Sequence, residues 1–270
     1  MANLLLHSMR EFDDVIVEII ERVRPRSLLE IGAETGSFTE RLVAYCEGNG
    51  GKLVTIDPAP HPELVEFARK NDTVTLVIGL SIPYLRENGC DAELALIDGD
   101  HNYYTVSNEL ELIHAAWLAS GTRGTMLLHD VGFPWGDRDL YYSPELIPDE
   151  ARHRYSYALG VTLDNDGLIA GGFRGEGQFA CALKRGGAKN GVLTAVRDFV
   201  SRHPEYVYRS IDAVFGLGAL TPRESPADAV IAEVFGRYDN ALVRRLERNR
   251  LELYLKVIEL QDLLNARGDA

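Results

Sequence analysis

The sequence predicts an α/β fold in which one largely parallel sheet carries helices on both faces. Strand-like and helix-like segments alternate along the first half of the chain, the order expected when helical crossovers connect parallel strands. Two strand-like runs, 94–97 and 125–128, are continuously apolar, as strands buried on both faces are. Each run ends in a cluster of acids and histidines, at the place where open α/β sheets bind ligands.

The first predicted element is a helix over 8–24. Ser8 and Glu11 form a capping-box pattern, apolar residues then recur on one face, and Pro25 ends the helix. The elements that follow are a strand over 27–32, a helix from about 37 to 47, a strand over 52–57, a helix beginning at Pro62, strands over 74–79 and 92–98, a helix beginning near Tyr103, and a strand over 124–129.

The alternation stops at residue 131. The segment 131–177 has little periodicity and many aromatic residues, and its length predicts a lid or substrate-binding loop. Its residues Trp135, Tyr141 and Tyr142 either stack on a bound acceptor or anchor the loop to the core. A strand over 178–184, a helix over 192–202 and a strand over 206–220 complete a predicted domain at 1–222.

The remaining residues, 223–270, are predicted to form a C-terminal helical extension, with one long helix over 227–266. Its apolar residues recur at steps close to a heptad, which Arg250 interrupts. These residues are Val243, Leu246, Leu253, Val257, Leu260 and Leu264. The pattern favours a homo-oligomer formed through this helix. The alternatives are that the helix packs against the chain's own domain or that it covers a strand-to-strand dimer.

Composition excludes several classes of partner. The 270 residues are 46% hydrophobic and 26% charged, which is ordinary for a globular protein, and the net charge of −13 disfavours nucleic-acid and anionic-membrane partners. Three widely spaced cysteines give no disulfide framework, so we expect a cytoplasmic protein. Residues 1–6 lack the features of a signal peptide, and no apolar run approaches the length of a membrane span.

A glycine-containing turn follows the first predicted strand. Gly32 and Gly36 allow the backbone to approach a ligand, and the spacing differs from the Gly-x-Gly-x-x-Gly of dinucleotide-binding folds, which disfavours a nicotinamide-dependent oxidoreductase. The acid Glu30 would repel a pyrophosphate and suits a cofactor with a cationic end. Asp57, at the end of the second strand, is placed to accept hydrogen bonds from ribose hydroxyls. The alternative is a tight turn with an incidental acid.

These motifs resemble those of class I S-adenosylmethionine-dependent methyltransferases, over roughly 27–220. The resemblance implies a Rossmann-like sheet of seven strands, whose last strand is antiparallel and corresponds to 206–220, with Phe215–Gly218 in it. It also implies roles in binding S-adenosylmethionine. Gly32 and Gly36 would line the methionine part, Asp57 would hold the ribose, Glu30 would support the loop near the aminoacyl end, and Ser81 would lie near the adenine.

The polar strand ends are similar to a narrower branch of small-molecule O-methyltransferases, which includes macrolide-sugar O-methyltransferases and the cephalosporin 7α-methylation enzyme. By this resemblance Asp98, His129 and Asp130 would bind a divalent metal, and His101 would act as the catalytic base beside Asp98. The metal-binding members carry an acid where this chain has His129. An imidazole there favours Mn, Fe, Ni or Zn over Mg. Alternatively, Asp98 and Asp130 hold loops and the cofactor amine, and His101 caps a helix or braces a loop.

We therefore expect an enzyme that transfers a methyl group from S-adenosylmethionine to a hydroxyl of a small molecule, such as a sugar or a glycosylated natural product, with assistance from a divalent metal (Mg, Mn or similar). A hydroxyl is a poor nucleophile at neutral pH, and a bound metal or a histidine base would activate it. The alternative from another class is a catalytically silent cofactor-binding scaffold that acts through the C-terminal helix.

Overall fold

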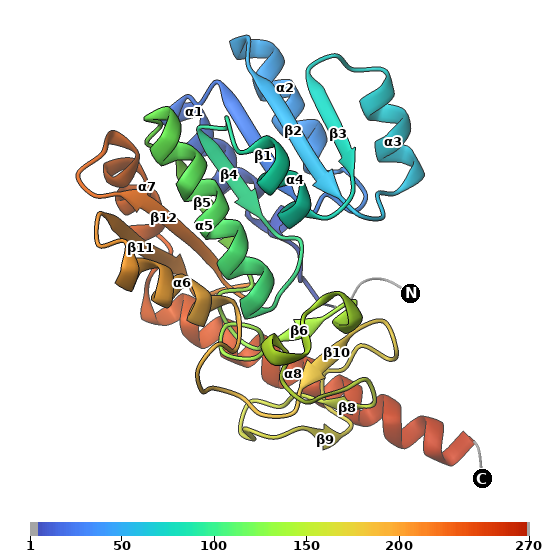
Figure 1. Cartoon of the computed structure of the whole chain (residues 1–270). Helices are drawn as coiled ribbons and strands as arrows, with labels where there is room; N and C mark the ends of the chain where they lie inside the picture. The colour runs from blue at the N-terminus through green and yellow to red at the C-terminus, as the bar shows by residue number, and fades with distance from the viewer. Residues whose placement is uncertain (1–4, 269–270) are drawn as a thin grey trace.

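The computed structural model describes residues 5–268, so residues 1–4, on which part of the signal-peptide prediction rests, lie outside the described residues. A seven-stranded sheet forms the centre of the molecule (Figure 1). Its strand order is β3-β2-β1-β4-β5-β12-β11, and β12 alone runs opposite to the other six strands. The strands are β1 (Ser27–Ile31), β2 (Lys52–Asp57), β3 (Val74–Ile78), β4 (Leu94–Ile97), β5 (Thr125–His129), β11 (Tyr206–Ile211) and β12 (Leu217–Pro222). The predicted Rossmann-like methyltransferase fold is confirmed.

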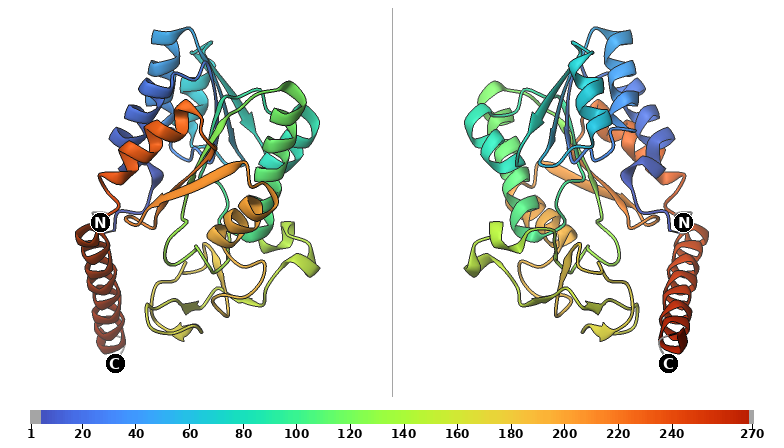
Figure 2. Two further views of the ribbon diagram at one scale, coloured as in Figure 1. Left: turned by 90° about the vertical axis from the view of Figure 1, so that its left-hand side faces the viewer. Right: turned by 90° about the vertical axis from the view of Figure 1, so that its right-hand side faces the viewer.

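Helices cover both faces of this sheet (Figure 2). One layer contains α1 (Asp13–Val23), α2 (Thr39–Asn49), α3 (Pro62–Arg69) and α7 (Pro226–Gly236), and the other contains α4 (Ser81–Asn88), α5 (Tyr103–Ser120) and α6 (Val192–Arg202). Successive strand residues point to opposite layers. Thus Leu28 packs in the core with α1, whereas Leu29 packs in the core with α5.

One prediction at the start of the chain needs correction, and one short helix further along was not predicted. The predicted helix over 8–24 is a 3₁₀ turn, η1 (Met9–Phe12), followed by α1, and Ser8 caps the 3₁₀ turn through the amide of Arg10. The short helix α4 was not predicted. It has eight residues, one of them Pro83, so it carries little helical periodicity.

The prediction of one strand over 206–220 is wrong, because β11 and β12 form a hairpin. Val214, Phe215 and Gly216 lie in its turn with φ of 46°, 64° and 95°, so only Leu217 and Gly218 of the predicted Phe215–Gly218 segment are in β12. The hairpin supplies both the sixth and the antiparallel seventh strand. The strand predicted over 178–184 is shorter, β10 (Ala180–Ala182), and belongs to a separate small sheet.

The irregular insertion after β5 has a small core of its own. β10 pairs with β6 (Leu140–Tyr141) and β7 (Tyr155–Ser156), and β8 (Leu159–Gly160) pairs with β9 (Ile169–Ala170). Two single 3₁₀ turns, η2 (Pro144–Leu146) and η3 (Asp149–Ala151), complete it. Trp135 and Tyr141 are buried and anchor the insertion, whereas Tyr142 is half exposed. Of the three aromatic side chains suggested for the acceptor, only Tyr142 remains available to one.

The predicted single C-terminal helix is also wrong, because Arg237–Asn240 separate α7 from α8 (Ala241–Gly268). Ile231, Val234 and Phe235 of α7 are buried in the same core as α1. The helix α8 extends past the insertion (Figures 1 and 2), and Arg174 of the insertion pairs with its Asp262. None of the helices within residues 5–268 has the length and hydrophobicity needed to cross a membrane.

Candidate active site

The carboxyl ends of the central strands bring most of the predicted site residues to one edge of the sheet. The loops after β1 and β4 pass so closely there that a Cβ on Gly32 would lie 2.3 Å from the carbonyl oxygen of Asp98. Gly32 also has φ of 85°, which disfavours any other residue. A Cβ on Gly36 would lie 2.7 Å from the Leu64 side chain. Both glycines are therefore required by the packing of the loop itself.

Glu30 is buried beneath this loop. Its Oε2 accepts hydrogen bonds from Thr39 Oγ1 of α2 at 2.7 Å and from Thr55 Oγ1 of β2 at 2.8 Å. Burial raises the pKa of Glu30 to about 7. The nearby carboxylates of Asp57 and Asp98 also raise this pKa, whereas the hydrogen bonds from the two threonine hydroxyls lower it. A cationic group arriving at the loop would favour the ionised form of this carboxyl.

Asp57 holds the same loop from the end of β2. Its Oδ2 accepts the amides of Ala33 and Glu34 at 2.9 and 2.8 Å, and its Oδ1 accepts the amide of Ala59 at 2.8 Å. A carboxylate offers about four lone-pair positions, so Oδ1 keeps one for a further donor.

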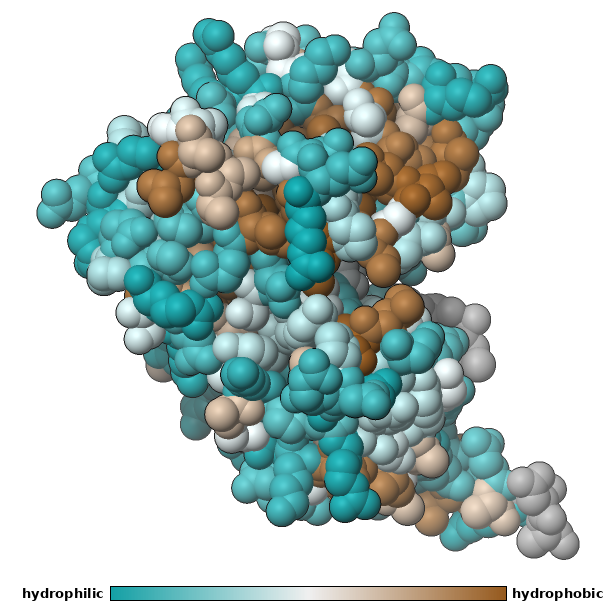
Figure 3. Space-filling model, in the orientation of Figure 1, coloured by the Kyte–Doolittle hydropathy of each residue, from teal (hydrophilic) through white to brown (hydrophobic). Residues whose placement is uncertain are grey.

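The end of β3 presents apolar surface next to Asp57. Ile78 pairs with Asp57 across the β2–β3 ladder and is 62% exposed, and Leu80 is 44% exposed. Hydrophobic surface of this kind is visible on the β3 and α3 side of the molecule (Figure 3). The sequence analysis did not select these two residues, although an apolar residue beyond a strand end is a usable signal.

Ser81, the predicted adenine neighbour, instead donates to a buried acid. Its Oγ lies 2.5 Å from Glu109 Oε1, and Glu109 Oε2 has no hydrogen-bond partner. Burial raises the pKa of Glu109 to about 8, although the hydrogen bond from Ser81 acts to lower it. A protonated Glu109 therefore ties α5 to the start of α4.

Asp98, His129 and Asp130 meet where β4 and β5 end. His129 Nδ1 lies 3.1 Å from Asp98 Oδ1 and 3.4 Å from Asp130 Oδ2. His129 Nε2 lies 2.9 Å from the carbonyl oxygen of Val214 in the β11–β12 turn, so Nε2 carries a proton and Nδ1 faces the two acids. Val214 has a strained, left-handed backbone conformation, and this conformation directs its carbonyl oxygen toward His129.

The two carboxylates determine the charge of His129. Burial alone would lower the pKa of His129, but Asp98 and Asp130 outweigh it and raise that pKa well above its usual value. Burial alone would raise the pKa of Asp130, but the neighbouring His101 and His129 outweigh burial and lower this pKa. Without a metal, the cluster therefore consists of an imidazolium between two carboxylates.

His101 lies on the other side of Asp130. Its Nδ1 is 3.1 Å from Asp130 Oδ2, and its ring meets Tyr142 edge-on at 5.7 Å between centroids. Burial and the neighbouring acids Asp130 and Asp98 raise the pKa of the Tyr142 hydroxyl, so it stays protonated. The helix-capping alternative for His101 is wrong, because Asn102 caps α5 by accepting the amide of Thr105. The contact with Asp130 is compatible both with a base and with the loop-bracing alternative.

The N-terminal segment also reaches the site, which the sequence did not predict. The amide of Met9 donates to Asp98 Oδ2 at 3.3 Å, and the Phe12 ring packs edge-on against His129. Both side chains are buried. This segment therefore covers the Asp98 side of the cluster, while Tyr142 covers the His101 side.

The donor set fits a divalent cation. One ligand atom from each of Asp98, His129 and Asp130 lies within 4.8 Å of the others, and Asp130 Oδ1 is buried without a hydrogen-bond partner. The bond from His129 Nε2 to a carbonyl is the orienting contact that metal-binding histidines usually have. Nδ1 can therefore hold either a proton or an ion.

Residues 29–131 match a family model described as a methyltransferase domain. This matched segment contains every residue predicted to bind the cofactor or a metal or to act as the base, and the last strand of the sheet is antiparallel, as the resemblance implied. By this match, residues 29–131 form a methyltransferase domain. The sequence-based identification of a methyltransferase enzyme is thereby confirmed.

Several solved structures are similar to this methyltransferase. The Podospora anserina methyltransferase PaMTH1, bound to S-adenosylhomocysteine, is 16% identical, with 80% of each chain covered and a TM-score of 0.48. The Streptomyces achromogenes O-methyltransferase TomG is 13% identical, with 81% of this chain and 82% of that chain covered and a TM-score of 0.44. An O-methyltransferase from Bacillus cereus is 15% identical, with coverages of 82% and 85% and a TM-score of 0.44. Likeness at this level assigns no substrate, and none of the curated proteins compared with the sequence matches it.

Proposed function

We propose that the methyltransferase transfers a methyl group from S-adenosylmethionine to a hydroxyl of a small molecule, such as a sugar or a glycosylated natural product. One observation carries the proposal: His101, backed by Asp130, lies at the strand ends that also hold the glycine loop and Asp57. A base beside a methyl-donor site is what a hydroxyl acceptor requires.

The donor half of the site has a matching surface for each part of S-adenosylmethionine. The remaining lone pair of Asp57 Oδ1 suits a ribose hydroxyl, and the exposed Ile78 and Leu80 suit the faces of adenine. The acidic groups Glu30 and Asp98 favour the cationic aminoacyl and sulfonium end. Ser81 then acts indirectly, by fixing α4 behind the adenine position.

The acceptor half uses His101 as the base. The Asp130 carboxylate favours the proton on His101 Nδ1, which leaves Nε2 free to take a proton from the acceptor hydroxyl. Tyr142, half exposed and in edge contact with His101, forms an apolar wall against which a sugar ring can lie. The cover formed by Met9, Phe12 and the insertion excludes water from the reacting groups.

A divalent metal bound by Asp98, His129 and Asp130 would lower the pKa of a coordinated hydroxyl. The imidazole ligand favours Mn, Fe, Ni or Zn over Mg. In the absence of an ion, the protonated His129 supplies a positive charge at the same place, so the two states compete for His129 Nδ1.

Methyl transfer to a panel of sugar and phenolic hydroxyls, with labelled S-adenosylmethionine, tests the proposal. We expect transfer by the wild type and its loss in Asp130→Ala, with calorimetric binding of S-adenosylhomocysteine retained by that variant. Binding of S-adenosylhomocysteine without transfer to any acceptor would favour the scaffold alternative. Full activity of Asp130→Ala in the presence of a chelator would contradict the metal.

Self-association through α8 remains part of the proposal. Leu251 of α8 faces the body of the molecule, whereas Leu246, Leu253 and Leu260 follow at seven-residue steps and are 50–59% exposed. A heptad stripe of leucines is complementary to a helix with the same stripe, and a second copy of α8 supplies one. We expect Leu253→Asp to lower the mass measured by light scattering to that of a monomer, and an unchanged mass would contradict the dimer.

Three buried free thiols are compatible with the cytoplasm as the location of the protein.

A further inference from the structure

A second cluster of histidines and carboxylates lies outside the methyl-transfer site, where α5, the end of α6 and the start of β11 meet. It contains His114 of α5, and His203 and Glu205 of the α6–β11 connection. One ligand atom from each side chain lies within 4.8 Å of the others. None of these residues has a part in the proposed methyl transfer.

The separations in this cluster are those of ligands around an ion. Glu205 Oε1 is 3.8 Å from His114 Nε2 and 3.7 Å from His203 Nδ1. Both distances are too long for good direct hydrogen bonds. Two tetrahedral ligands at 2.0–2.1 Å from zinc are about 3.4 Å apart, so small side-chain movements would complete the coordination.

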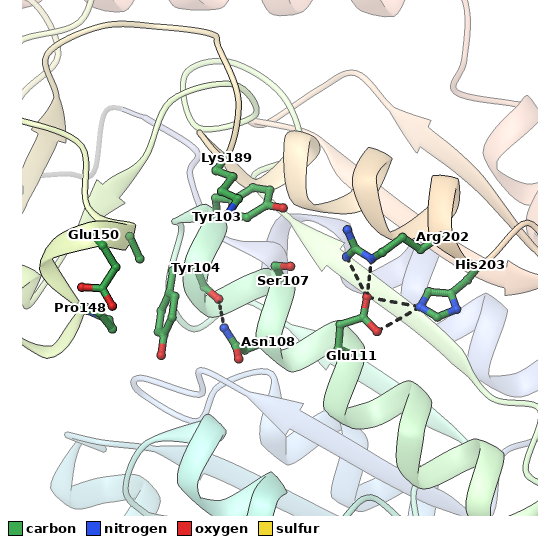
Figure 4. Close-up of a pocket in the computed structure, with 11 residues that line it drawn as sticks. Tyr103, Tyr104, Ser107, Asn108, Glu111, Pro148, Glu150, Lys189, Arg202 and His203 are labelled. Atoms are coloured by element: carbon green, nitrogen blue, oxygen red, sulfur yellow. Dashed lines mark hydrogen bonds and ion pairs between the residues drawn. The ribbon is translucent and has the colours of Figure 1, made fainter.

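The outer nitrogen of each imidazole is already engaged. His203 Nε2 contacts the Glu111 carboxylate at 3.0 Å, and His114 Nδ1 lies 3.4 Å from the Tyr206 hydroxyl. A carboxylate behind a histidine is the arrangement that orients imidazole ligands toward zinc. Glu111 is also held by Arg202, and it lies between Arg202 and His203 at one end of a cavity of about 680 Å³ (Figure 4).

Packing fixes both rings in this orientation. The two imidazole centroids are 4.1 Å apart, and the buried Phe199 ring contacts both. The two rings are thereby held side by side, with His114 Nε2 and His203 Nδ1 each within 4 Å of Glu205 Oε1.

We propose that His114, His203 and Glu205 form a second metal site, which binds a divalent transition ion of the zinc type and joins α5 to the α6–β11 connection. Two imidazoles and one carboxylate suit Zn, Ni or Co better than Mg or Ca. The three protein ligands leave a fourth position for water. The side chain of Glu205 is half exposed, so an ion has access from solvent.

Calorimetric titration of chelator-treated protein with Zn²⁺ tests the site, in an Asp130→Asn background that weakens the other candidate metal site. Asp98→Asn serves as the background if Asp130→Asn does not fold. We expect one Zn²⁺ to bind, and Co²⁺ to give the absorption bands of a tetrahedral complex. Glu111→Gln should weaken binding by about 10–100-fold, as loss of an orienting partner does, and His203→Gln should weaken it more.

His61→Gln is the matched control, because His61 also has an acidic neighbour, Glu63 at 3.9 Å, but is half exposed and has no second histidine. We expect this control to bind Zn²⁺ as its parent does, and circular dichroism to show that each variant is folded. Absence of Zn²⁺ binding in the Asp130→Asn protein, or equal binding by the His203→Gln and His61→Gln variants, would overturn the proposal.

Discussion

Two clusters contain the same kinds of side chain in different surroundings. The first consists of Asp98, His129 and Asp130, and the second of His114, His203 and Glu205. In the first, the buried His129 Nδ1 lies 3.1 and 3.4 Å from two carboxylates. In the second, the separations between histidine and Glu205 are 3.7 and 3.8 Å, and Glu205 is half exposed. Without an ion, the two nearby carboxylates favour a proton on His129 in the first cluster, whereas the wider separations in the second cluster suit an ion. We therefore expect burial and spacing, rather than residue types, to decide what each cluster binds.

The largest expected effect separates the clusters by catalysis. His101→Gln removes the base backed by Asp130, so we expect kcat for methyl transfer to fall by about 10²–10⁴-fold with little change in the KM for the donor. The matched change His153→Gln alters a histidine whose Nε2 contacts the carbonyl oxygen of Lys189, outside the proposed site, and it should leave kcat unchanged. Equal rates for the two variants, measured at saturating donor, would remove His101 from the mechanism.

Stability distinguishes the two clusters next. His129→Ala leaves Asp98 and Asp130 facing each other without a cation, and we expect a loss of about 3–5 kcal/mol in the free energy of unfolding. His203→Ala removes a partly exposed contact and should cost only about 0–1 kcal/mol in metal-free protein. Urea unfolding of both variants measures the difference. Similar losses would mean that the two histidines are equally important to the fold.

The response to pH sharpens the same contrast. Burial raises the pKa of Glu30 to about 7 in the folded protein. Protonation of Glu30 therefore stabilises the fold fully below pH 4.5, and this contribution is lost as the pH rises through 7. Burial would also raise the pKa of Glu111 beside the second cluster, but Arg202 and His203 lower it, so its contribution is present at neutral pH and is lost on acidification. The two regions therefore respond to pH with opposite sign.

Glu30→Gln isolates the first of these responses. The amide mimics the protonated acid, so the variant should gain up to about 3 kcal/mol over the wild type at pH 8 and almost nothing at pH 4. Glu63→Gln, which changes an exposed acid, provides the control. Parallel pH profiles for the wild type and Glu30→Gln in urea unfolding would show that Glu30 is not protonated in the folded protein.

Much of the sheet and of the site followed from the sequence. The apolar runs at 94–97 and 125–128 are β4 and the first residues of β5, which are neighbours, and so Asp98 and Asp130 converge as expected. The contacts of His101 and Tyr142 depend on the fold of the insertion, whose strands pair at long range, and periodicity carries no information about such pairing. For the same reason β10 was predicted correctly as a strand but was assigned to the wrong sheet.

The β11–β12 hairpin escaped prediction for a local reason. Val214 and Phe215 favour extended backbone in isolation, yet both adopt positive φ, and a β-branched residue seldom does so. Tertiary contacts compensate for that conformation. The carbonyl oxygen of Val214 accepts a hydrogen bond from His129 Nε2, and the carbonyl oxygen of Phe215 accepts one from the amide of Gly132. These contacts are visible only in the folded chain.

The position of β12 has a consequence for how the protein is made. The carbonyl that orients His129 lies 85 residues further along the chain, in a hairpin whose second strand inserts next to β5. During synthesis, β1 to β5 leave the ribosome long before this partner exists, so Asp98, His129 and Asp130 emerge without the contact that arranges them. The methyl-transfer site is thus completed only when Leu217–Pro222 has been translated and has docked, late in biosynthesis.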